Sequence, residues 1–381
     1  MSGELPSGDG RPEALIVSDG RFYSLREPAP IDAAQGSLGN GASYEKPDPP
    51  QRVPDPWPKA EGSGADSTKS KAQVFLTVDT EDDYFETPHM LTGEGLGEEY
   101  GAYGILEILE RHGLSATFFV NVYEAHRHRD PGVMESLVKT IHERGHEVAL
   151  HSHPSEDLEF YSRPLYWFDA DEQIRILGYG AELIEKWTGS HPVSFRAGGY
   201  VLNDHTFEAL EGLGFRIDSS VFFRSDKNRI TPFTVNAVRM RGKLIEVPVT
   251  YVPRVEEDGQ IEHRKFDVNW LSQEDLNSVV DRVSRFGIGE AMFMMHSFSF
   301  IDKSSLPEKQ RGTPIARYRS QPMRSRYVEI YGSHPVLRDR FDRFAERLAS
   351  DPMVEVRTLA ESEEALSQRA RTAHPDIIPL V

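Results

Sequence analysis

The chain of 381 residues contains no cysteine, which excludes disulfides, thiolate metal ligands and cysteine nucleophiles. Positive charge is scarce: 43 Lys and Arg stand against 61 Asp and Glu, giving a net charge of −18. This balance argues against nucleic acid or an anionic membrane as the main partner. Long apolar runs and the features of a secretory signal are also missing. We therefore expect a soluble, cytoplasmic protein whose metal sites, if any, use imidazole and carboxylate, since 14 His are present.

Composition divides the chain into three parts. Residues 1–70 form a low-complexity extension rich in Gly, Pro, Ser, Ala and Asp, which is typical of an extended or disordered linker. Within it, residues 14–25 carry Asp19-Gly20 between two apolar runs, which predicts a hairpin. Residues 71–367 show regular helix and strand patterns, and residues 368–381 form a tail.

In the central part, amphipathic helices end at Gly and short apolar strands follow within a few residues. The expected strands are 74–78, 116–120, 147–150, 193–195, 215–217, 244–249, 291–295 and 354–358, and the expected helices are 105–112, 134–144, 174–187, 206–213, 276–286 and 341–348. This alternation predicts an α/β fold with a parallel sheet, most economically closed as a (β/α) barrel of about seven or eight strands. An open doubly wound sheet is the alternative, disfavoured because no Gly-rich phosphate loop follows the first strand.

Four acids follow the first expected strand: Asp79, Glu81, Asp82 and Asp83. The apolar run before them predicts a strand buried on both faces, and ligand sites in such sheets lie beyond the carboxyl ends of the strands. Crowded carboxylates repel one another, so a divalent metal or a protonated partner would have to compensate. A solvated acidic loop is the competing interpretation.

Other strand ends carry residues that can bind metal, move a proton or hold an anion: Asn121, His151, His153, Arg196, Asp218 and His296. His151 and His153 are two residues apart, so strand alternation could direct both imidazoles into one cavity. Two imidazoles with one or two carboxylates form an open site for zinc or a similar divalent ion. A pair of surface histidines in a loop is the alternative.

His296 and Arg196 each allow two interpretations. His296 follows an apolar strand and could act as a general acid or base, or it could be a hydrogen-bonded core histidine. Arg196 could orient a catalytic carboxylate, hold an anionic substrate or form a structural salt bridge.

Several segments together resemble the NodB-like polysaccharide deacetylases over about residues 72–366. The matching segments are TVDTEDDYF, GHEVALHSHPSED, FRAGGY, GFRIDSSV, MMHSF and ASDPMVEVRTLAE. The family consists of metal-dependent enzymes on a distorted (β/α) barrel that remove N- or O-acetyl groups from sugars. The resemblance implies a divalent metal, zinc first, with cobalt, nickel or manganese as alternatives, and a carbohydrate substrate.

The resemblance also implies roles for single residues. Asp79 would be the catalytic base, Arg196 would lie beside it, and His296 would be the general acid. The metal ligands would be His151, His153 and Asp82, with Glu81 as the competitor of Asp82. Tyr200, Asp218 and Trp270 would lie at the substrate groove.

Three departures from the family pattern bear on this expectation. Ser155 occupies the usual place of the second histidine, so His153 would have to supply that imidazole. Gly198 and Gly199 replace the proline of the third motif, and Asn269 stands in the relic of the fourth motif, where it would change how the arginine is held. These changes allow an altered substrate or lost activity.

The sequence thus predicts a metal-dependent hydrolase that removes an acetyl group from a sugar or glycan intermediate, with N-deacetylation favoured. A catalytically impaired glycan-binding or scaffold protein on the same barrel is one alternative. A metal-dependent phosphoesterase is another, because such barrels also carry a Leu-His-x-His signature. That signature would be expected on the first strand, whereas here it ends the third.

Overall fold

The computed structural model describes most of the chain between residues 71 and 372. The described residues are 71–82, 89–93, 100–126, 132–154, 164–223, 225, 227–230, 236–255, 261–286, 290–302 and 335–372, together with 15–18, 21–24 and 332–333. In the N-terminal extension, β1 (Leu15–Ser18) and β2 (Arg21–Ser24) pair antiparallel, as the predicted hairpin requires. The rest of the predicted extension, and Asp83, lie outside the described residues.

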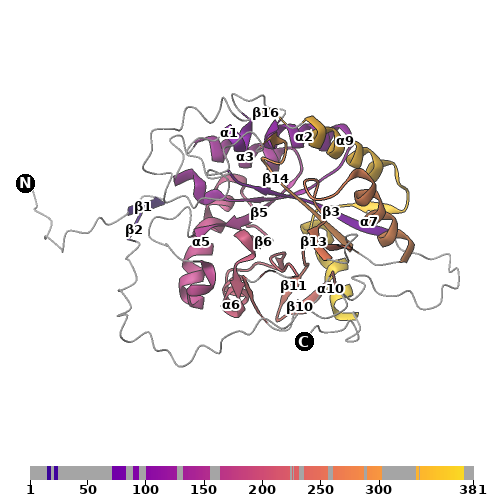
Figure 1. Cartoon of the computed structure of the whole chain (residues 1–381). Coiled ribbons are helices and arrows are strands. Elements are labelled where there is room, and N and C mark those ends of the chain that lie inside the picture. Colours follow the sequence, from indigo (N-terminus) through magenta and orange to yellow (C-terminus); the bar gives the residue numbers. More distant parts are fainter. Residues whose placement is uncertain are drawn as a thin grey trace, which may run out of the picture.

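A curved nine-stranded sheet forms the centre of the molecule (Figure 1). Its strands are β3 (Ala72–Thr80), β4 (Thr117–Val120), β5 (Glu147–Ser152), β6 (Ser194–Ala197), β8 (Ile217–Asp218), β10 (Arg239–Arg241), β11 (Leu244–Glu246), β14 (Glu290–His296) and β17 (Val354–Val356). The order is β10-β11-β8-β6-β5-β4-β3-β14, and β17 also pairs with β3. All neighbours are parallel except β10 and β11, so the predicted α/β fold with about seven or eight parallel strands is confirmed, as a curled sheet consistent with a (β/α) barrel.

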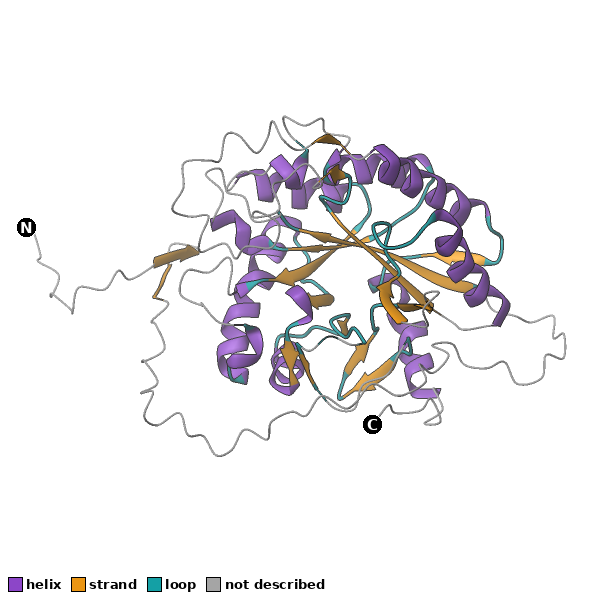
Figure 2. Cartoon of the chain, viewed as in Figure 1, coloured by secondary structure: helices purple, strands orange, loops and turns teal. Residues whose placement is uncertain are grey.

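The main helices lie along the outside of this curved sheet (Figure 2). They are α2 (Ala102–Arg111), α3 (Gly132–Glu143), α5 (Ala170–Thr188), α6 (Asp204–Gly212), α7 (Gln273–Phe286), α9 (Pro335–Ser350) and α10 (Glu363–Thr372). Several begin earlier than predicted: α5 starts at a capping box formed by Asp169 and Glu172. The last helix continues to Thr372, past the domain boundary predicted at residue 367. Among the described helices, none combines the length and apolar character needed to cross a bilayer.

The barrel closes through a short irregular seam between β11 and β14. The N–H of Met292 donates to Oγ1 of Thr250 at 2.8 Å, and the N–H of Met294 donates to the carbonyl of Phe266 at 2.9 Å. A single parallel bridge joins Asp267 to Met294. Before the seam, β12 (Tyr251–Val255) and β13 (Ile261–Lys265) form an antiparallel hairpin that the sequence analysis did not predict. The seam therefore brings the end of this hairpin beside β14.

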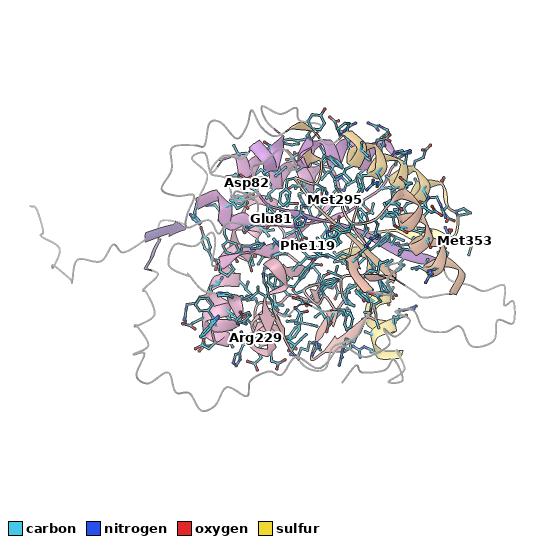
Figure 3. All side chains as sticks on the ribbon, viewed as in Figure 1. Glu81, Asp82, Phe119, Arg229, Met295 and Met353 are labelled. Atoms are coloured by element: carbon cyan, nitrogen blue, oxygen red, sulfur yellow. The ribbon has the colours of Figure 1, made fainter. Side chains whose placement is uncertain are left out.

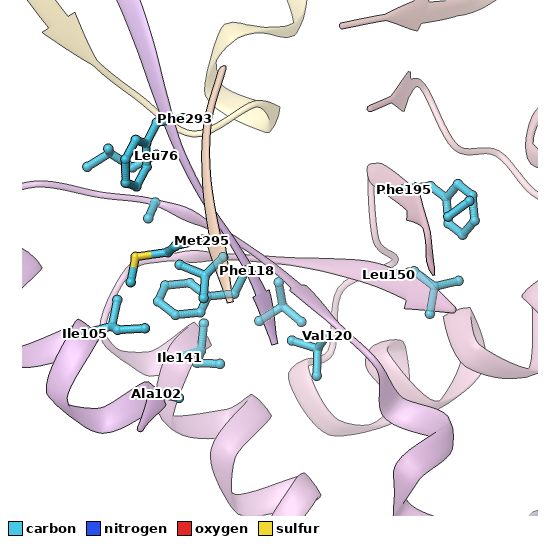
Figure 4. Packing of buried hydrophobic residues seen from close by; sticks show 14 of the residues in the cluster. Leu76, Ala102, Ile105, Phe118, Val120, Ile141, Leu150, Phe195, Phe293 and Met295 are labelled. Carbon is cyan, nitrogen blue, oxygen red and sulfur yellow. The ribbon is translucent and has the colours of Figure 1, made fainter. Parts of the chain in front are cut away.

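Two hydrophobic clusters show which side chains face outward and which face into the barrel. Val74, Leu76 and Val78 of β3 belong to the larger cluster, which packs against the helices, whereas Phe75 belongs to a smaller inner cluster. Figure 4 shows this outer packing, with residues of the strands lying against Ile105 and Ile141 of α2 and α3. Since side chains alternate along a strand, the inner face of β3 continues from Phe75 to positions 77 and 79.

His146 is a buried titratable group in the loop between α3 and β5, 5% exposed. Its Nδ1 accepts the N–H of Ala116 at 3.2 Å, so in the neutral ring the proton is on Nε2. Among the described residues, Nε2 has no hydrogen-bond partner. Burial lowers the pKa of His146 to about 4, with Glu110 opposing this shift and Arg144 adding to it. Protonation would break the bond to Ala116 and place a charge in the core.

This arrangement predicts an acid-sensitive stability. The pKa of His146 is lower in the folded chain than the 6.5 of an unfolded one, so the unfolded state binds the proton first. The free energy of unfolding should fall by about 2 kcal/mol from this group between pH 7.5 and pH 5. His146→Asn, which keeps an acceptor for Ala116, should flatten this dependence in urea unfolding measured at both values. The exposed His205→Asn is the control, and an unchanged slope in His146→Asn would contradict the prediction.

Candidate functional site

Strand alternation brings the predicted site residues to the inner face of the barrel. Ala149 of β5 lies in the inner cluster and Leu150 in the outer one, so the next inner position is His151. On the same argument, outward Phe195 leaves Arg196 facing inward. The ladder register then sets the neighbours, because Arg196 lies beside His151 and His296 lies beside Asp79.

Glu81, His151 and His153 form a candidate metal centre, since one potential ligand atom from each lies within 4.8 Å of the others. Nε2 of His153 is 2.8 Å from Oε2 of Glu81, and Nε2 of His151 is 3.4 Å from the same oxygen. Nδ1 of His151 is 2.8 Å from the carbonyl of Arg196, which holds the proton on Nδ1 and leaves the Nε2 lone pair for a metal. Burial raises the pKa of Glu81, but His153 and His151 outweigh it, so the pKa lies well below its usual value.

The structure groups Glu81, and not Asp82, with the two imidazoles; Figure 3 labels both residues. The N–H of Asp82 donates to both carboxylate oxygens of Glu124, at 2.8 and 3.0 Å. Ser297 Oγ donates to the carbonyl of Glu81 at 2.6 Å and accepts its N–H at 3.2 Å. These bonds fix the chain just after β3, and residue 81 keeps the inward parity of residue 79 while residue 82 does not. This grouping favours Glu81 as the ligand, and the choice of Asp82 stays a prediction.

Arg196 and Asp79 form a buried ion pair at the centre of the site. Nη1 of Arg196 lies 2.6 Å from Oδ1 of Asp79 and 2.9 Å from Oγ1 of Thr77, and the guanidinium lies 4.1 Å from the ring centre of Phe119. Nε and Nη2 donate to the carbonyl and Oγ of Ser219. Burial raises the pKa of Asp79, but the charges of Arg196 and of two nearby histidines lower it by more. The net pKa lies below its usual value, so the carboxylate is ionised.

His296 lies at the rim of the same site and is the most accessible of the three site imidazoles. Its Nε2 is 3.7 Å from Oε1 of Glu81, and its side chain is 26% exposed, against 2% for His151. The ring stacks on Phe298 with centroids 4.8 Å apart, and the backbone N–H of His296 donates to Oγ of Ser299. The imidazole thus faces both the acidic centre and solvent, which suits proton exchange with a substrate.

Two of the three residues predicted at the substrate groove, Tyr200 and Trp270, lie close to Nζ of Lys265. Tyr200 adopts a left-handed φ of 61° and donates from its hydroxyl to Sδ of Met294 at 3.0 Å. Burial raises the pKa of Tyr200; Lys265 opposes this shift and the charge of Asp79 adds to it. Trp270 is 46% exposed, so its indole is open to a ligand.

Asp218 has a different place from the one predicted. It is 0% exposed, and burial raises its pKa to about 7. Its carboxylate accepts the hydroxyl and the N–H of Ser220, and Ser220 Oγ in turn accepts the N–H of Ala197. Asp218 therefore does not reach a substrate. It orders the turn that contains Ser219, and Ser219 holds Arg196.

The sequence analysis missed four residues that support the site, Thr77, Glu124, Ser219 and Ser297, and one cation near it, Lys265. Alternation could have identified Thr77, which is two residues before Asp79 on the same face. The Asp258-Gly259 pair was an unused signal for the hairpin that carries Lys265. Asn269 bonds the carbonyl of Ser299, at 3.3 Å, rather than taking part in the network around the arginine.

The turn at Gly198 explains one departure from the family pattern. A Cβ at this position would lie 2.3 Å from Nε2 and Cδ2 of the His153 ring. Any side chain at position 198 would therefore displace His153 from Glu81. A proline at position 198, the residue that the resemblance leads one to expect, would be incompatible with this position of His153.

Residues 66–217 match the family model described as polysaccharide deacetylase. A peptidoglycan deacetylase-like protein of Gibberella zeae is 33% identical over 127 residues, which is 32% of each chain, so the match spans about a third of that relative's length.

Among solved structures, the fold resembles one from Mycobacterium smegmatis assigned as a polysaccharide deacetylase, with 22% identity, 82% of this chain and 95% of that chain covered, and a TM-score of 0.47. It also resembles the allantoinase PuuE, with 15% identity, 85% and 96% coverage, and a TM-score of 0.46.

Gly198→Ala should weaken metal binding. The added methyl group must push the His153 ring, so we expect the affinity for Zn²⁺ to fall at least ~10-fold, as when a supporting contact of a ligand is lost. Gly212→Ala is the matched control, because its Cβ would meet Ile174 at an ordinary 3.5 Å. Isothermal titration with Zn²⁺ measures both; equal affinities would contradict the packing argument.

The choice between Glu81 and Asp82 has its own test. Glu81→Gln removes a charged donor from the centre and should lower the Zn²⁺ affinity by ~100-fold or more, beyond the usual cost of an outer contact. Asp82→Asn should leave the affinity within a few-fold of the native value. Bound metal is measured by mass spectrometry after dialysis, with circular dichroism as the folding control. The reverse order of effects would restore Asp82 as the ligand.

Proposed function

We propose that this chain, whose residues 66–217 match the polysaccharide deacetylase family, is a metal-dependent hydrolase that removes an acetyl group from a sugar, with an N-acetyl group favoured. One observation carries the proposal. A two-histidine, one-carboxylate cluster, an arginine-bound aspartate and an accessible imidazole meet at one edge of the sheet. Acetyl transfer to water needs these three kinds of group together.

Glu81, His151 and His153 would hold the metal. The donor set fits a divalent ion: both histidines offer Nε2, the carboxylate is ionised, and three protein ligands leave a position open. Zinc suits imidazole and carboxylate best, with cobalt, nickel and manganese as alternatives. When bound, such an ion supplies Lewis-acid chemistry to the acetyl carbonyl.

Asp79 would act as the general base. Arg196 holds one of its oxygens at 2.6 Å, which keeps the carboxylate ionised and fixes its direction. The position of Asp79 at the end of β3, beside His151 and Glu81, allows its other oxygen to take a proton from the attacking water.

His296 would act as the general acid. Across the ladder it pairs with Asp79, and its Nε2 is 3.7 Å from Glu81, so base and acid lie on adjacent strands. An amine is a poor leaving group until its nitrogen is protonated, whereas an alcohol leaves more readily. A rim imidazole that exchanges protons with solvent therefore favours an N-acetyl over an O-acetyl substrate.

The rival functions have less support. The scaffold alternative needs a lost ligand, but His153 stands beside Glu81 although position 155 is serine. The phosphoesterase alternative places its Leu-His-x-His signature on the first strand, whereas here these residues end β5. A carbohydrate as the partner and a cytoplasmic location stay predictions.

Asp79→Asn should abolish turnover while the metal stays bound. The amide still accepts a bond from Arg196 but cannot take a proton, so acetate release should fall ~10²- to 10⁴-fold. Acetate is measured over a panel of N-acetylhexosamine conjugates with and without chelator, and metal content by mass spectrometry. The exposed Asp171→Asn is the matched control. Full activity of Asp79→Asn would overturn the assignment of the base.

A further inference from the structure

Lys265 is a half-buried cation at the wall of the site that the reaction just described does not use. It is the last residue of β13, and its Nζ lies 4.9 Å from the ring centre of Tyr200, 5.7 Å from Phe222 and 6.0 Å from Trp270. Tyr200 and Phe222 are themselves in contact, with centroids 5.4 Å apart. The ammonium group is thus framed by aromatic rings, one of which, Trp270, is 46% exposed.

The charge of Lys265 is retained in this position. Burial lowers its pKa, but Tyr200, Asp267 and Asp79 outweigh that effect, so the pKa is raised and the side chain is protonated at neutral pH. Among the residues that the structure describes, no carboxylate forms a salt bridge with Nζ. An ammonium group has three donors, so contact with the Tyr200 hydroxyl leaves capacity for a ligand.

A second cation lies at the same turn. Nζ of Lys227 is 3.1 Å from the place that a Cβ of Gly199 would occupy, so it covers the residue between Gly198 and Tyr200. The chain as a whole carries a net charge of −18. The two ammonium groups beside one turn of the site therefore form a local positive region on an acidic protein. In contrast, Arg196 is fully buried and bonded to Asp79, so it does not hold a substrate anion.

Resting on the proposed function, we propose that Lys265 and Trp270 form a subsite for an acidic sugar, whose ring packs on the indole while its carboxylate or phosphate is bound by the ammonium group. The acidic group is carried by the acetylated sugar or by the sugar next to it. Lys227 adds to the positive potential over the same turn. The enzyme then selects acidic over neutral glycans by charge, and not by contacts at the acetyl group.

The test uses the full chain loaded with Zn²⁺ and matched substrates. The probes are N-acetylglucosamine as its methyl glycoside and as a disaccharide with glucose, each in neutral, 6-carboxylate and 6-phosphate form. Acetate release gives kcat and KM for the native chain, for Lys265→Met, which keeps the length of the side chain, and for Lys186→Met. Lys186 is exposed in the last turn of α5, so its substitution changes the net charge equally.

We expect the native chain to prefer an acidic probe. Lys265→Met should raise KM for that probe ~10- to 100-fold, the usual effect of losing one hydrogen bond to a charged group, with kcat within twofold. Neutral probes and Lys186→Met should show no change beyond twofold. The carboxylate and phosphate arms identify which acid is bound.

The outcomes separate this inference from the proposed function. Equal use of neutral and acidic probes, or an equal loss on both in Lys265→Met, would overturn the acidic subsite while deacetylation stands. If no probe releases acetate, calorimetric binding of the acidic disaccharide to the native chain decides. Binding that Lys265→Met abolishes supports the subsite without the reaction, and binding that it leaves unchanged overturns it.

Discussion

The site depends on one buried ion pair, that between Arg196 and Asp79. The guanidinium is 0% exposed and bonds Asp79, Thr77 and Ser219, so the cost of burying it is offset only while these residues stay in place. Breaking such a pair from one side typically costs about 3–5 kcal/mol. The same pair joins β3 to β6 across the barrel interior and keeps the carboxylate ionised. The stability of the barrel interior and the ionisation of Asp79 therefore both depend on this one ion pair.

The rest of the site follows from how this pair is surrounded. The carbonyl of Arg196 sets the tautomer of His151, and the turn that begins at Gly198 leaves room for the ring of His153. Both histidines then meet Glu81, which Ser297 holds through its backbone. A small change in β6 or its turn would be transmitted to the candidate metal centre, because His151 and His153 both contact it.

The irregular seam places additional side chains beside the site. Where a regular barrel would continue its ladder, only single bonds join Thr250 and Phe266 to β14, and a hairpin projects beside the site. That hairpin ends in Lys265, and Trp270 follows shortly after it. The groups proposed to carry the chemistry, Asp79, Arg196 and His296, come from regular strands, whereas the groups proposed to select the substrate come from the irregular closure. Strands hold reacting groups in fixed positions, whereas the loops between strands tolerate changes of sequence.

The sequence by itself determined the parallel barrel and the places of Asp79, His151, Arg196 and His296, because apolar runs ending in polar residues define strand ends without knowledge of distant contacts. It also held an unused signal: alternation from Asp79 favours residue 81 over residue 82, which the family pattern had obscured. Only the tertiary structure decided that Asp218 is buried support. Residues far apart in the sequence pack together around Asp218, and local sequence patterns do not indicate which neighbour covers a side chain.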